Sequence, residues 1–261
     1  MTAFATMDGT RAAAPGFNPV ARLAAGLLLP FIIVWSLDPV SAAVALTLEL
    51  ALFPLLGIRW RTFWARTAVI WIAAPLSGLT FLLYAPSSGQ VYLSWALVEI
   101  SDGSILLAVS AVLRVLAIAL PAVVLLIGVD PTDLADGLAQ LVHLPARFVI
   151  GALAAFRLVG LLRDDFRMLE LARRARGIAD RGKVRRFFGL AFALLVLAIR
   201  RGSALATAME ARGFGGPEPR TWARESRLSG RDAVLVAVAF LVGAVAVSAA
   251  VVTGWWNPVV G

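Results

Sequence analysis

The sequence contains no cysteine and only one histidine, His143, among its 261 residues. Disulfides, thiolate metal sites and cysteine nucleophiles are therefore excluded, as is a metal cluster built on several histidines. His143 stands two residues before Pro145. We expect it to be a helix-end or interfacial residue with no ligand-binding role.

Charge is also absent from several long stretches, and these stretches are strongly apolar. Hydrophobic residues make up 60% of the chain, and the mean hydropathy is +0.86. Crossing a bilayer core takes about 20 apolar residues per helix. The sequence therefore predicts an all-α, polytopic membrane protein with about five transmembrane helices, at residues 21–37, 40–57, 67–84, 105–128 and 233–252.

The remaining charge is unevenly distributed. Residues 128–231 hold 18 of the 24 basic residues and 10 of the 16 acidic ones, whereas residues 85–104 have no basic residue. Because cytoplasmic loops are enriched in arginine and lysine, we expect 128–231 and the N-terminus inside, and 85–104 and the C-terminus outside. The expected location is the inner (plasma) membrane.

This pattern divides the chain into four parts. We expect a disordered N-terminal tail without a cleavable signal at residues 1–16, and transmembrane helices 1–4 within 17–128. A cytoplasmic coupling-helix domain follows at 129–231, and 232–261 holds the last transmembrane helix. The helices of the cytoplasmic part are amphipathic, and the sequence leaves open whether 146–163 and 187–199 cross the membrane or lie on it.

Two long helices of this cytoplasmic part are each expected to end in Ala-Arg-Gly. The motifs are Ala175-Arg176-Gly177 and Ala211-Arg212-Gly213. Glycine lets the chain turn away at a helix end, and the guanidinium offers a planar fork for a carboxylate. The motifs are candidate docking knobs, although arginine is also favoured at helix C-termini by the helix dipole.

Two ionisable residues lie inside the expected membrane spans. Arg114 is near the middle of the fourth span and Glu49 is in the second. A charge at that depth costs about 2.5–3.5 kcal/mol on insertion scales, so Arg114 should face protein or water. An ion pair between the two and a role in conformational change both remain open.

The ordered landmarks of residues 128–222 resemble the transmembrane T component of energy-coupling factor (ECF) transporters, the family of cobalt-, biotin- and vitamin-uptake permeases. The landmarks are an Asp-Leu helix, Leu144-Pro145, Phe156-Arg157, both Ala-Arg-Gly motifs and Met209-Glu210. Asn18-Pro19 and Arg22 resemble the family's opening motif more weakly. The chain departs from the family in having glycine at position 160, where members commonly carry proline.

The resemblance implies a coupling subunit without catalytic activity. Its implied partners are two cassette ATPase subunits or one fused pair, and a small membrane subunit that captures a vitamin or transition-metal ion. The six motif residues would dock on the ATPases, with Arg157, Glu170, Arg173 and Glu210 in supporting roles. No metal or cofactor is expected in this chain, because the partners would bind ATP.

Three alternatives remain open. A membrane enzyme acting on lipid phosphates would use the arginine-rich segment, but Asp164-Asp165 is the only acidic pair there and is more typical of a solvated helix face. A membrane-anchored nucleic-acid binder is a second alternative, although acidic residues interrupt the basic ones. A purely structural membrane protein is the third. The glycine-rich 213–219 lacks the Lys and Ser/Thr of a nucleotide-binding loop.

Overall fold

The computed structural model describes residues 16–36, 38–86, 88–95, 98–177, 182–216, 221–222 and 224–257. The tail expected at residues 1–16 therefore lies outside the described residues, apart from Gly16. The chain divides into two compact units. The first comprises Met1–Asp130 with Arg227–Gly261, and the second comprises Pro131–Ser226.

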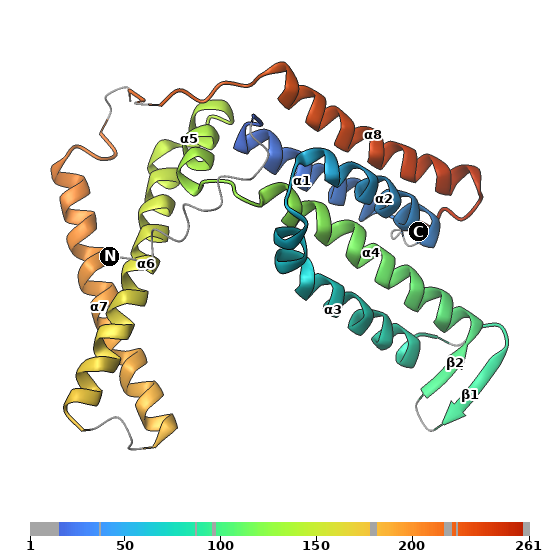
Figure 1. Ribbon diagram of the computed structural model, residues 1–261, viewed down its shortest axis with the longest axis horizontal. Coiled ribbons are helices and arrows are strands. Elements are labelled where there is room, and N and C mark those ends of the chain that lie inside the picture. Colours follow the sequence, from blue (N-terminus) through green and yellow to red (C-terminus); the bar gives the residue numbers. More distant parts are fainter. Residues whose placement is uncertain are drawn as a thin grey trace. The chain divides into compact units, whose positions relative to one another are not determined.

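The first unit is a bundle of long apolar helices with one small β-hairpin (Figure 1). Its elements are α1 (Pro19–Ile33), α2 (Pro39–Leu52), the 3-10 helix η2 (Phe53–Leu56), α3 (Trp60–Tyr84), β1 (Val91–Trp95), β2 (Val98–Ser101), α4 (Asp102–Leu126) and α8 (Gly230–Val252).

Polar caps begin the helices of this unit. Asn18 caps α1 and Asp38 caps α2, and in both cases a proline occupies the first helical position, where its missing N–H has no cost. Capping boxes begin α4, with Ser101 and Ser104, and α8.

Small residues let four of these helices pack closely. α1 and α2 each lie between α4 and α8, while α3 flanks α4 (Figure 1). Ala25, Ala45, Ala117 and Ala246, one from each helix of the central group, are completely buried. Small side chains allow close backbone approach in membrane bundles, and the core combines these alanines with larger apolar residues such as Leu120 and Val124.

Residues 85–104, the segment expected outside the membrane, contain the β-hairpin. β1 and β2 pair antiparallel, with Leu93 opposite Ile100 and an irregularity between Val91 and Leu93. Alternating β-branched and aromatic residues favour strands at these positions. The Asp102 carboxylate accepts a hydrogen bond from Gln90 N (3.2 Å), and a hydrogen bond to Asp102, together with its charge, raises the pKa of Tyr92.

The second unit consists of three helices, α5 (Pro131–Leu141), α6 (Ala146–Ala175) and α7 (Lys183–Ala211). α6 contacts both of its neighbours, and it crosses α7 (Figure 1). No residue of α6 is fully buried, and in α7 Leu190 is the one described apolar residue that is. The two long helices therefore expose apolar side chains over most of their length.

The structure confirms an all-α fold with about five transmembrane helices. Among the described residues, the helices long and apolar enough to cross a membrane are Pro39–Leu56, Trp60–Tyr84, Asp102–Leu126, Val184–Ala211 and Gly230–Val252.

This set differs from the expected one in two helices: the span expected at 21–37 is absent from it, and α7 is present. The span expected at 21–37 is the 15-residue α1, because the chain turns after Ile33 so that Asp38 can cap α2. α7 joins the set because an alanine-rich stretch extends the apolar 187–199 toward residue 211.

Candidate functional site

Both Ala-Arg-Gly motifs end a helix, as expected from the sequence. α6 ends at Ala175 and α7 ends at Ala211, with the arginine of each motif as the C-cap. Gly177 has φ +68° and Gly213 has φ +79°, the left-handed region that favours glycine.

The end of α7 has the hydrogen bonds of a Schellman motif. Gly213 N donates to Glu210 O (2.9 Å) and Phe214 N donates to Met209 O (3.0 Å). At the end of α6, Gly177 N donates to Arg174 O (3.0 Å), the equivalent of the first of these bonds. The glycines thus satisfy terminal carbonyls and leave the preceding arginine at the tip of the helix.

The two motif arginines are available for binding. Arg176 and Arg212 are exposed, and within the described part of the chain neither side chain has a hydrogen bond or an ion pair. An unpaired guanidinium can bind a carboxylate through two parallel hydrogen bonds.

The motifs lie at opposite ends of the α6–α7 pair (Figure 1). An ion pair between Arg186, near the start of α7, and Glu170 brings that start next to the end of α6. α7 has 29 residues. At 1.5 Å per residue, the helix separates the two arginines by on the order of 40 Å. One socket therefore cannot hold both.

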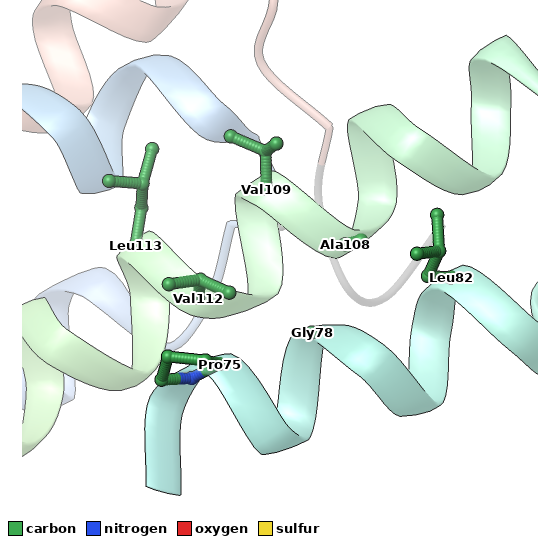
Figure 2. Close-up of a pocket in the computed structure, with 7 residues that line it drawn as sticks. All are labelled: Pro75, Gly78, Leu82, Ala108, Val109, Val112 and Leu113. Carbon is green, nitrogen blue, oxygen red and sulfur yellow. The ribbon is translucent and has the colours of Figure 1, made fainter. Parts of the chain in front are cut away.

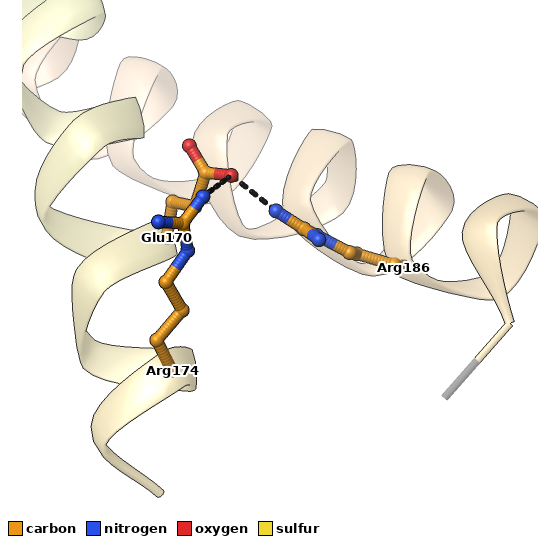
Figure 3. A network of polar contacts seen from close by, with 3 residues as sticks. All are labelled: Glu170, Arg174 and Arg186. Carbon is orange, nitrogen blue, oxygen red and sulfur yellow. Dashed lines mark hydrogen bonds and ion pairs between the residues drawn. The ribbon is translucent and has the colours of Figure 1, made fainter. Parts of the chain in front are cut away.

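Polar contacts fix the two helices against each other beside Arg176. The Glu170 carboxylate accepts hydrogen bonds from Arg174 (3.1 Å) and from Arg186 of α7 (Figure 3). Arg173 lies over Gly189, where an added Cβ would be 3.0 Å from the guanidinium. Farther along the crossing, Arg201 of α7 pairs with Asp165 of α6 at 2.6 Å, and we define these contacts together as the α6–α7 brace.

A second polar cluster lies inside the first unit, at the turn between α1 and α2. Arg114 of α4 donates a hydrogen bond to Val34 O. Close to this turn the buried Asp38 carboxylate accepts hydrogen bonds from Ser36 and from both N and Oγ of Ser41 (2.9 Å to Oγ). Arg114 therefore meets a protein environment, as its depth requires.

Glu49 is not the partner of Arg114 within the described residues. Its side chain is 2% exposed, and neither carboxylate oxygen has a hydrogen-bond partner there. Glu49 lies on the buried face of α2 with Ala42 and Ala45.

The family model of the cobalt transport protein CbiQ matches residues 16–222, which include α1 to α7 and both motifs. This chain belongs to the CbiQ family. The expected resemblance to the T component is thereby confirmed, and the chain is a multi-pass membrane component of a transporter.

Similar proteins agree with this membership. The chain is 27% identical over 226 residues to the energy-coupling factor transporter transmembrane protein EcfT of Limosilactobacillus fermentum, covering 81% of this chain and 83% of the relative. It is 28% identical over 239 residues to EcfT of Streptococcus thermophilus, covering 87% and 90%. EcfT of Streptococcus equi is 26% identical over 239 residues, covering 87% and 88%.

The four supporting residues of this CbiQ family member lie in different places. Glu170 and Arg173 take part in the α6–α7 brace, and Glu210 lies in the last turn of α7. Arg157 is exposed, has no side-chain partner among the described residues and lies 19 residues before Arg176, about 28 Å along α6. The structure therefore separates Arg157 from the Arg176 motif.

The sequence did not predict several of the contacts that the structure shows in this family member. The buried Arg22 donates to Ile127 O (2.8 Å) at the end of α4, and Asn18 N donates to the Asp232 carboxylate (2.6 Å), joining the starts of α1 and α8. The Asp38 cluster was missed as well, although aspartate followed by proline and, three residues on, serine is a helix-start pattern that could have indicated it.

The other surfaces of the described residues offer little chemistry. An open groove of about 280 Å³ between α3 and α4 is lined entirely by apolar residues, among them Pro75, Gly78 and Val112 (Figure 2). Among the described residues there is no group of three or more His, Asp or Glu that could hold a metal ion. The motif ends are therefore the principal candidate site.

Proposed function

We propose that this chain is the membrane coupling subunit of an ATP-driven ECF-type importer. Two cassette ATPase subunits, or one fused pair, dock on the Arg176 and Arg212 ends, and a separate small membrane subunit captures the substrate. The observation that carries the proposal is a pair of exposed arginines at glycine-terminated helix ends, on opposite ends of one helix pair. Neither has a side-chain partner within the described residues.

The geometry favours two docking partners acting together. A separation on the order of 40 Å requires two separate sockets. Each guanidinium suits an acidic groove, and removing one partner of a buried arginine–carboxylate pair typically costs about 3 kcal/mol or more.

The α6–α7 brace supplies the means of transmission. Glu170–Arg186 and Asp165–Arg201 link the helices at two points. A displacement that a closing ATPase pair imposes on one helix end is therefore transferred to the other helix, and from there to the rest of the chain.

The charges of α6 support a cytoplasmic position for both helices. α7 has the length and composition of a membrane span, yet its Arg186 and Arg201 are paired with residues of α6. Between residues 157 and 174, α6 carries eight charged residues. Burial of each in the bilayer centre would cost about 2.5–3.5 kcal/mol, which favours α7 on the inner membrane surface. The shorter apolar α1 then crosses the membrane together with α2, α3, α4 and α8. Five crossings leave the N-terminus cytoplasmic and the C-terminus outside.

In this role the chain is not an enzyme. ATP is bound and hydrolysed by the partner subunits, and selectivity for a vitamin or transition-metal ion resides in the capture subunit. Asp165, half of the acidic pair on which the lipid-phosphate alternative depends, has a structural account in its pairing with Arg201.

Substitution of both motif arginines tests the proposal. Arg176→Ala with Arg212→Ala should abolish uptake and co-purification of the ATPases, because both sockets lose their charged contact. The control is Arg163→Ala with Arg200→Ala, which removes one arginine from each of the same two helices. Both arginines are exposed and have no partner among the described residues. Normal uptake by the motif variant, or equal loss in the control, would overturn the docking role.

A further inference from the structure

The two motif ends differ in the charge that surrounds their arginine. The windows from six residues before to ten residues after each arginine are 170–186 and 206–222. The first holds seven basic and two acidic residues, and the second holds two of each. The motifs are alike, but their surroundings are not.

Part of the basic charge at the Arg176 end has no pairing partner among the residues that the structure describes. Glu170 is already neutralised by Arg174 and Arg186. Arg173, over Gly189, and the exposed Arg185 have no ion pair among the described residues. Three guanidiniums without a partner in the described ranges, counting that of Arg176, therefore lie around this end.

The Arg212 end carries one arginine and little else of either sign. Glu210, two residues earlier, is exposed and has no side-chain partner in the described part of the chain. The last ion pair with α6 is that of Arg201, so the ten residues 202–211 of α7, about 15 Å, extend beyond the brace. Arg212 is thus presented alone on a projecting helix.

We infer that the Arg176 end docks on a broad acidic protein surface, whereas Arg212 enters a socket that offers one carboxylate and little further charge. This inference rests on the proposed function and specifies its partners. Attraction between a basic cluster and an acidic patch accelerates encounter and is screened by salt. Binding through the Arg176 end is accordingly salt-sensitive, and binding through the Arg212 end is much less so.

Anionic lipid would also complement a basic cluster, and the exposed Val184, Phe187 and Phe188 next to Arg185 are apolar side chains of the kind that enter a bilayer. The turn that carries Arg176 itself, however, favours protein. The last turn of α6, residues 172–176, contains only alanine and arginine. Segments that lie in a membrane surface combine basic residues with large apolar side chains that enter the bilayer. This turn has nothing larger than a methyl group to insert.

The experiment measures binding of a purified ATPase pair to the full chain in neutral phosphatidylcholine nanodiscs. The ATPases are those identified with the wild-type chain after co-purification. Dissociation constants are compared at about 0.05 and 0.5 M NaCl, which shortens the Debye length severalfold. The variant Arg173→Gln with Arg185→Gln removes the surrounding charge but retains Arg176. Arg163→Gln with Arg200→Gln is the control, and Arg185→Gln alone avoids disturbing the contact with Gly189.

We expect the Arg173/Arg185 variant to bind about tenfold more weakly at low salt and to lose most of the salt dependence, with about half the effect for Arg185→Gln alone. The control should change binding less than twofold. In a background with Arg212→Ala the remaining binding should be strongly salt-dependent, and with Arg176→Ala it should be nearly independent of salt.

Equal behaviour of the variant and its control would overturn the inference while leaving the coupling function intact. Salt dependence that appears only when phosphatidylglycerol is added would assign the cluster to lipid and overturn it too. A wild-type chain that binds no ATPase at either salt concentration would overturn the proposed function itself, and the inference with it.

Discussion

Gly213 ends α7 in a conformation that an alanine adopts poorly. Its φ is +79°, and an added Cβ would meet no atom within 4 Å. Replacement by alanine therefore introduces no steric overlap, and any effect comes from the backbone alone. We expect Gly213→Ala to unwind the Schellman motif and displace Arg212.

Two opposing effects determine how much Gly213→Ala changes the local stability of the helix end. An L-residue in the left-handed region costs roughly 1–2 kcal/mol, and the lower entropy of the unfolded chain returns about 0.4–1 kcal/mol. The net loss is about 1 kcal/mol of local stability. Since 1.4 kcal/mol is a factor of ten, amide exchange in the last turn of α7 should accelerate about fivefold.

Gly202 provides a matched control in the same helix. It also has open space around its Cβ position but lies within the regular part of α7. Gly202→Ala should therefore stabilise the helix by about 0.5–1 kcal/mol. Gly213→Asn should be tolerated better than alanine, because asparagine adopts the left-handed conformation more readily.

Hydrogen exchange of residues 205–213, combined with ATPase co-purification, measures both consequences. We expect opposite signs of the exchange change for the two alanine variants, and reduced ATPase binding for Gly213→Ala only. If both variants changed exchange in the same direction, the left-handed conformation of Gly213 would not be what holds the helix end.

Three further experiments test other features of the structure. A double-mutant cycle of Glu170→Gln and Arg186→Gln should give a coupling of about 0.5–1 kcal/mol, small because both side chains are partly exposed. Gly78→Ala should lower the stability of the bundle by about 1–3 kcal/mol, because its Cβ would lie 2.4 Å from Val112 Cγ2, and a thermal melt in detergent would show it. His143 has φ +57°, so His143→Gly should raise the melting temperature by relieving about 1 kcal/mol of strain.

Residue patterns of short range account for what could be predicted from the sequence. The helix ends at Ala175 and Ala211 depend on glycine two residues later, and the apolar runs define α2, α3, α4 and α8. These features follow from local backbone preference and from hydrophobic length, which the sequence contains directly. Membership of the CbiQ family was likewise carried by ordered local motifs.

Contacts between distant residues were beyond such reasoning. Arg114 and Glu49 were the two obvious ionisable residues of the spans, yet Arg114 bonds to Val34 O, and neither oxygen of Glu49 has a partner among the described residues. A backbone carbonyl is an acceptor at every position, so the sequence gives no sign of which one an arginine will reach. The early end of α1 was also not predictable. Hydropathy extended this span to residue 37, but α1 ends at Ile33 and Asp38 already caps α2.

The sequence by itself determined that this protein is a helical membrane transport component and where its two motif helices end, since apolar length and glycine act locally. Only the tertiary structure decided that α6 and α7 are braced near Arg176 and that Arg212 projects freely at the opposite end. That difference arises from side-chain pairs such as Glu170–Arg186, 16 residues apart, and Asp165–Arg201, 36 residues apart. Such pairs form only when the chain reverses and two helices cross at a particular register.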